Sequence, residues 1–145
     1  MNPKVMRVLV LSLGFLSLGF FAGNAFGQLH RFEVEFPQAF TVRQTELPPG
    51  KYIIDEISQN TFTISNSPET KRVMFMAEPI NSLEPAKKSQ VTLNVYDGTQ
   101  RFLAQLWREG DTWGRAVIKD DAEVKLMKEA QVKTEECPCV ATHKQ

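Results

Sequence analysis

Apolar and polar residues alternate along most of the chain beyond residue 30. In residues 31–36, for example, Phe32, Val34 and Phe36 are separated by single charged residues. A period of two is typical of a β-strand that buries one of its faces. The same pattern recurs in short segments that are separated by turn residues. We expect strands at residues 31–36, 40–45, 52–57, 61–65, 72–77, 90–96, 101–108 and 113–118.

Turn signals lie between these segments. The strongest is Asp97-Gly98, a dipeptide typical of a tight β-hairpin, and a Pro-Pro-Gly turn stands at residues 48–50. Residues 78–88 are rich in proline and polar residues and are expected to form a loop. About eight short strands at intervals of roughly 8–12 residues favour a mainly β fold, either an antiparallel sandwich or a small barrel.

One helix is predicted after the strands, at residues 120–131. Asp120 is a suitable N-cap, and Glu123 stands three residues later in the capping-box position. The expected apolar face consists of Ala122, Leu126 and Ala130, with Met127 beside them.

The first 27 residues have the features of a secretory signal peptide. Lys4 and Arg7 precede an uncharged apolar segment at residues 8–22, and the small residues Ala25 and Gly27 follow where a signal peptidase would read them. An uncleaved anchor helix is the alternative, but the apolar segment is shorter than the roughly 20 residues that a bilayer requires. We therefore expect cleavage and export to the periplasm or the extracellular space.

Domain organisation and charge follow from this division. Residues 28–133 are expected to form one β-rich domain that includes the helix, and residues 134–145 to form a flexible tail. The formal net charge is zero, and the leader removes two basic residues and no acidic ones, so the exported chain is slightly acidic. This balance argues against nucleic acid as a partner. Without the leader, the chain is not expected to span a membrane.

The tail contains the only two cysteines of the chain, Cys137 and Cys139, with one proline between them. Two thiols in an oxidising compartment usually pair, but a bridge across so short a ring is strained. The alternatives are cross-links between chains, a metal site that includes His143, or cysteines without dedicated chemistry. Structural zinc normally has four ligands at wider spacing, so no metal or other cofactor is expected.

Motifs of catalysis are missing from the sequence. It contains no Gly-x-Ser-x-Gly elbow, no phosphate-binding loop and no His-Glu-x-x-His motif. The two histidines, His30 and His143, lie near the ends of the predicted domain, where no scaffold would position them. The adjacent Asp55 and Glu56 would point to opposite faces of a strand. We therefore expect no catalytic residues and no enzymatic activity.

Six side chains are candidates for a ligand or partner surface. Tyr52, Tyr96, Trp107 and Trp113 could line a groove, although ordinary packing on a sheet is the favoured explanation. Met74 and Met76 alternate with Val73 and Phe75, so that strand is apolar on both sides. It is expected to be central or covered by the helix; a hydrophobic pocket or partner surface is the alternative.

Five short segments of the chain form a recognisable pattern: 47–50 (Leu-Pro-Pro-Gly), 96–98 (Tyr-Asp-Gly), 102–107 (Phe-Leu-Ala-Gln-Leu-Trp), 114–115 (Gly-Arg) and 121–123 (Asp-Ala-Glu). They resemble a family of small uncharacterised secreted bacterial proteins, frequent in acidobacterial-type genomes. That family has an LPAG-x-Y turn, a YG…FL-x-x-W hairpin and a Gly-Arg segment that leads into a short helix. Pro49 and the Cys-Pro-Cys segment depart from the pattern. The resemblance implies a similar fold and no particular activity.

Three functional hypotheses follow. The first is an exported, non-enzymatic β-domain that makes contact with another protein or with copies of itself, in the cell envelope or outside the cell. The second is a lipocalin-like protein that holds a small apolar ligand among inward Phe and Val side chains. The third is thiol or metal chemistry at Cys137 and Cys139. If sheet edges serve in assembly, the first and last strands are the candidates.

Overall fold

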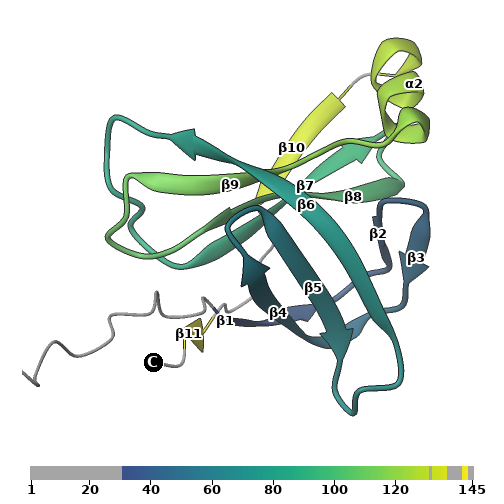
Figure 1. Ribbon diagram of the computed structural model, residues 1–145. Coiled ribbons are helices and arrows are strands. Elements are labelled where there is room, and N and C mark those ends of the chain that lie inside the picture. Colours follow the sequence, from purple (N-terminus) through teal and green to yellow (C-terminus); the bar gives the residue numbers. More distant parts are fainter. Residues whose placement is uncertain (1–30, 131, 137–141, 144–145) are drawn as a thin grey trace, which may run out of the picture.

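The computed structural model describes residues 31–130, 132–136 and 142–143. Within these ranges the chain is mainly β, with one helix after the long strands, as the sequence predicts (Figure 1). The strands are β1 (Arg31–Phe36), β2 (Phe40–Val42), β3 (Thr45–Leu47), β4 (Gly50–Ser58), β5 (Thr61–Asn66), β6 (Arg72–Asn81), β7 (Gln90–Tyr96), β8 (Gln100–Trp107), β9 (Trp113–Val117), β10 (Val132–Glu136) and β11 (Thr142–His143). The helix is α2 (Asp121–Glu129).

The strands join into one sheet in the order β10-β7-β8-β9-β6-β5-β4-β1-β11, and β2, which forms a hairpin with β3, pairs with β8. All the pairs are antiparallel except β2 with β8. The long strand β6 belongs to both halves, because its first part pairs with β5 and its second part with β9 (Figure 1). The sheet is not closed into a barrel.

The alternating pattern places the core between the two halves of the sheet. Phe32, Val34 and Phe36 of β1 are all buried, and the charged residues between them are not. Aromatic rings fill much of this space: Phe36 stacks on Phe40 with ring centroids 3.8 Å apart, and Phe62 lies 5.6 Å from Phe75. Other members of the core are Val42, Leu47, Ile54, Ile64, Val91, Leu103 and Leu106.

The predicted Asp97-Gly98 hairpin is confirmed between β7 and β8. Both residues have positive φ angles, +52° and +72°. A type I′ turn requires positive φ at both central positions, and its twist matches that of the flanking strands. The Thr99 N–H donates to the Tyr96 carbonyl at 3.2 Å across this turn, and the register of the two strands pairs Tyr96 with Gln100.

The predicted loop at residues 78–88 is wrong at its start, because β6 continues to Asn81 opposite β9. Pro79 is compatible with this strand. The Ala77 N–H donates to the Asn60 carbonyl, away from β9, and the residue two positions later has the same orientation. β5 begins at Thr61 and does not reach that level, so the N–H that Pro79 lacks would have no ladder partner to bond.

Strands continue beyond the helix among the described residues, including residues 134–136 and 142–143, which fall within the expected tail. Val132–Glu136 forms β10 along β7, and Thr142–His143 forms β11 beside β1. β10 has no alternating apolar pattern, so its pairing rests on backbone hydrogen bonds to β7 and on a 3.5 Å hydrogen bond from Thr134 Oγ1 to Asn94 Oδ1.

The helix begins where the sequence predicts. Asp120 is its N-cap, and the Asp120 carboxylate accepts a 2.8 Å hydrogen bond from the Glu123 N–H. The rest of the prediction needs correction. The Glu123 side chain is buried and accepts hydrogen bonds from Tyr96 and Asn94 of β7, while Ala122 is exposed. The helix therefore faces the sheet with a carboxylate in place of part of the expected apolar face.

Candidate interaction surface

The outward face of β6 is the most unusual surface in the described part of the chain. Val73, Phe75 and Ala77 point toward the core, so the residues between them point outward. Met74 is 56% exposed and Met76 is 50% exposed, although β6 has neighbours on both sides. Large apolar side chains in the middle of a sheet are normally covered, and an exposed apolar patch often marks an interaction site.

Neighbouring strands extend this apolar surface. Ala77 is paired with Val117, so Ile118 lies opposite Met76, and the Ile118 N–H donates to the Met76 carbonyl at 2.9 Å. Ile118 is 43% exposed. On the other side, Ile57 lies in the bulge of β4, next to Ser58, and it is also exposed. Ser58 pairs with Thr61 of β5, which in turn pairs with Met76. We call Met74, Met76, Ile118 and Ile57 the methionine face.

The expectation that the helix covers Met74 and Met76 is wrong. α2 is held at β7 through the hydrogen bonds of Glu123, and Figure 1 shows it at the far end of β7 and β8, away from β5. The part of the expectation that places the strand inside the sheet is confirmed, because β6 lies between β5 and β9. The methionine face is therefore open to solvent.

Opposite charges stand at the two ends of the methionine face. Arg72 and Glu78 occupy the outward positions before Met74 and after Met76, and both are exposed. Arg72 forms an ion pair with Glu69, in which both side chains are more than half exposed. Because an exposed pair of this kind contributes little energy, Arg72 can be recruited by another carboxylate.

The two tyrosines of the chain do not line a groove with the tryptophans. Tyr52 is buried, donates to the Pro48 carbonyl at 2.6 Å and packs edge-on against Phe36 and Phe40. Burial raises the pKa of its hydroxyl. Tyr96 is buried beneath the helix, on the opposite side of β7 from the main core. Both tyrosines therefore have packing roles.

Trp107 and Trp113 also lie apart from the tyrosines. Trp107 is half-buried, covers Gly114 on the neighbouring strand and donates from Nε1 to Gln105 Oε1 at 3.0 Å. Trp113 is 59% exposed and borders a cavity of about 100 Å³. At that cavity Arg115 Nη2 lies 3.6 Å from Glu56 Oε1, an ion pair that joins β9 to β4. Trp113 is the one aromatic candidate of these four with a large exposed surface.

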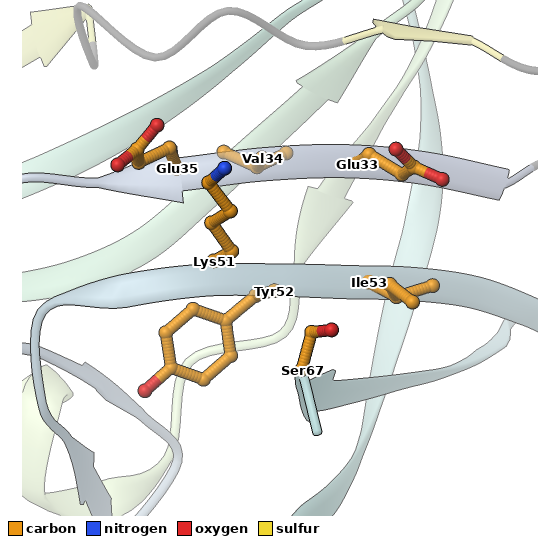
Figure 2. Close-up of a pocket in the computed structure, with 7 residues that line it drawn as sticks. All are labelled: Glu33, Val34, Glu35, Lys51, Tyr52, Ile53 and Ser67. Atoms are coloured by element: carbon orange, nitrogen blue, oxygen red, sulfur yellow. The ribbon is translucent and has the colours of Figure 1, made fainter. Parts of the chain in front are cut away.

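A cavity of about 310 Å³ lies on the outward side of β1 and β4. Figure 2 shows Glu33 and Glu35 on β1, with the Lys51 side chain extending from β4 toward that strand. The remaining lining residues are Val34, Tyr52, Ile53 and Ser67. Its charged lining differs from the apolar interior that a lipocalin-like binder requires, and the inward Phe side chains pack on one another instead.

Two further predictions concern residues outside the described ranges. The leader, residues 1–27, and the thiol pair, Cys137 and Cys139, both lie there. Within the described ranges, no group of three or more His, Cys, Asp or Glu residues is placed to hold a metal ion. In the same ranges, no helix has the length and apolar character needed to cross a membrane.

Comparison of the chain with protein-family models, with curated proteins and with solved structures gives no match. The methionine face therefore has to be interpreted from its own chemistry.

Sequence reasoning identifies Met74 and Met76 but not the four residues around them, which are Ile57, Ile118, Arg72 and Glu78. The alternation identifies Ile118 only as a strand residue, and its position opposite Met76 depends on the pairing of β6 with β9, which the sequence does not reveal. The adjacent Pro79 places Glu78 in the predicted loop. The usable signal is the alternation of Arg72, Met74, Met76 and Glu78, which continues the period of two up to the residue before Pro79.

Proposed function

We propose that the protein is an exported, non-enzymatic β-domain that acts through protein–protein contact, with the methionine face as its contact surface. The observation that carries this proposal is that Met74 and Met76 are exposed on a strand that has neighbours on both sides. Methionine side chains are flexible and polarisable, so they adapt to the shape of a partner. Neighbouring Ile118 extends the apolar area across a second strand.

The face of the sheet is a better contact surface than its edges. β10 is an edge strand among the described residues and carries Lys133, Glu135 and Glu136. Charged side chains on an edge strand oppose the addition of further strands. At the other end of the sheet, β1 already pairs with β11 at Phe32 and Glu33. These features favour contact through side chains over contact through backbone hydrogen bonds.

Export and the absence of catalysis are supported by the sequence. The basic, apolar and small-residue regions of the first 27 residues form the pattern of a secretory signal. The sequence lacks the motifs that position a nucleophile with its base. The resemblance to small secreted bacterial proteins is consistent with this role and remains a prediction.

The proposal can be tested by site-specific photo-cross-linking in intact cells that produce the protein. A photoreactive residue at position 76 is expected to give a discrete adduct with another protein chain. The matched control is the exposed strand position Glu46, which lies on β3. Adding Met74→Asp is expected to remove the adduct from position 76. No adduct, or equal adducts from both positions, would overturn the proposal.

A further inference from the structure

The outward face of β6 has a pattern that is complementary to itself. Along the strand the exposed side chains are Arg72, Met74, Met76 and Glu78. The two ends carry opposite charges, and the two middle positions carry the same apolar side chain. At about 3.3 Å per residue, the charged positions are separated by roughly 20 Å along the strand. Reversal of this strand therefore exchanges a positive end for a negative one and leaves the centre unchanged.

This pattern selects one arrangement of two copies. A two-fold axis in the plane of the contact, perpendicular to β6 and between Met74 and Met76, makes the two β6 strands antiparallel. Met74 then faces Met76 of the second copy, and Arg72 faces Glu78 of the second copy. The contact between Arg72 and Glu78 is therefore formed twice, because a two-fold interface uses the same patch on each subunit. We infer that the partner at the methionine face is a second copy of this chain in this antiparallel arrangement.

The opposite orientation is disfavoured by the same charges. With the two β6 strands parallel, Arg72 would face Arg72 and Glu78 would face Glu78. Like charges brought together in an interface are repulsive, so the charged ends select the orientation while the methionines supply the apolar area. Ile118 beside Met76 widens the apolar strip in both copies. Thr63, which pairs with Met74 on the other side, is short and buried, so it leaves the methionine accessible.

The size of the methionine face predicts a weak dimer. Stable interfaces bury about 800 Å² on each partner. Four partly exposed apolar side chains with a charge at each end provide less surface than that. Dimerisation is therefore expected to depend on protein concentration and to weaken as salt screens the exposed charges. This inference rests on the proposed function, since it identifies the partner at the same surface.

The test uses charge reversal in the exported form of the full chain, followed by sedimentation velocity over a series of concentrations. Arg72→Glu makes both ends of β6 negative, and Glu78→Arg makes both positive. Each single variant is expected to dimerise about tenfold more weakly than the wild type, because two attractive contacts become repulsive. An equimolar mixture of the two variants is expected to restore dimerisation. The double variant Arg72→Glu/Glu78→Arg is also expected to dimerise, because the exchange preserves complementarity.

Controls separate this inference from misfolding and from the proposed function. Glu46→Arg reverses an exposed charge on β3 and is expected to leave dimerisation unchanged; circular dichroism checks that every variant is folded. A wild-type chain that is monomeric at all concentrations, or a mixture that fails to restore dimerisation, would overturn the inference. If the chain is monomeric but position 76 still cross-links to a different protein, the second-copy inference is wrong and the proposed function stands. If position 76 gives no adduct, the proposed function fails as well.

Discussion

The hydroxyl of Tyr96 donates a 2.9 Å hydrogen bond to Oε1 of Glu123, and this contact holds the helix on the sheet. The same carboxylate oxygen accepts a 3.2 Å hydrogen bond from Asn94 Nδ2. Glu123 is only 4% exposed, so water has little access to its carboxylate. The two donors from β7 supply the hydrogen bonds that water would form with an exposed carboxylate. Asp120 therefore determines where the helix begins, and Glu123 determines where the helix packs on the sheet.

Removal of the Glu123 carboxylate is expected to destabilise the domain. Glu123→Ala leaves the Tyr96 hydroxyl and the Asn94 amide buried without their acceptor and should lower the free energy of unfolding by about 2 to 3 kcal/mol. Tyr96→Phe removes one donor and should cost about 1 kcal/mol. Equilibrium urea unfolding followed by circular dichroism measures both. Glu129→Ala, on the exposed side of the same helix, is the matched control and should have little effect.

The tyrosines predict a loss of stability in alkaline solution. The pKa of Tyr96 is raised mainly by burial and further by its hydrogen bond to Glu123, and burial also raises the pKa of Tyr52. Tyrosines in the unfolded chain lose their protons near pH 10, while the folded chain still holds them. The unfolded state is therefore favoured progressively as the pH rises above about 10, and the free energy of unfolding falls.

Urea unfolding between about pH 8 and pH 11 tests this sign. The decrease in the free energy of unfolding is absent below about pH 10, because the tyrosines are protonated in both the folded and the unfolded state there. Tyr96→Phe should make the alkaline decrease less steep than in the wild type, and Tyr52→Phe should do the same independently. Lysines also titrate in this range, so the comparison between variant and wild type carries the result. Identical slopes for wild type and Tyr96→Phe would contradict the prediction.

The features that the sequence predicted well are local. Asp97 and Gly98 specify their turn by their own backbone preferences, and Asp120 caps the helix by reaching a backbone N–H three residues away. The period of two in residues 31–36 identifies which side chains are buried without any knowledge of the neighbouring strand. Each of these outcomes depends on a few consecutive residues.

The features that the sequence did not predict depend on contacts between distant segments. The strand at Glu78 is formed by pairing with Ala116, which outweighs the local loop signal of Pro79. β10 is formed because β7 offers an edge, although its own residues are mostly charged. The exposure of Met74 and Met76 depends on where the helix docks, and a buried carboxylate on the helix determines that position.

Gly114 is expected to tolerate no side chain. A Cβ at this position would lie 2.8 Å from ring atoms of Trp107, which covers it from the neighbouring strand. The indole is held in place by its 3.0 Å hydrogen bond to Gln105, so it cannot move without losing that bond. Gly114→Ala should therefore lower the free energy of unfolding by about 1 to 3 kcal/mol.

A double-mutant cycle assigns that loss to the ring. In a Trp107→Leu background the smaller side chain leaves room for the new methyl group, so Gly114→Ala should cost much less there. Thermal or urea unfolding of the four proteins gives the coupling energy. Equal costs in the two backgrounds would mean that the glycine is required for a reason other than contact with Trp107.

Oxidation of the exposed methionines is expected to abolish the proposed contact. A sulfoxide is polar, so Met74 and Met76 would no longer provide an apolar surface after treatment with peroxide. Met127 lies on the helix and is also exposed, so Met127→Leu is the background that removes the contribution of this third methionine. Mass spectrometry measures the extent of oxidation, and sedimentation velocity measures dimerisation in the same samples.

Leucine at positions 74 and 76 distinguishes an effect of methionine oxidation from an effect of side-chain size and shape. Met74→Leu/Met76→Leu keeps apolar side chains of similar volume at the centre of β6 and removes the sulfur atoms. This variant should dimerise before and after peroxide treatment, whereas the chain with both methionines should dimerise only before it. Because both side chains are exposed on the folded domain, circular dichroism should change little on oxidation. Dimers that persist after complete oxidation of Met74 and Met76 would show that the methionine face is not the contact surface.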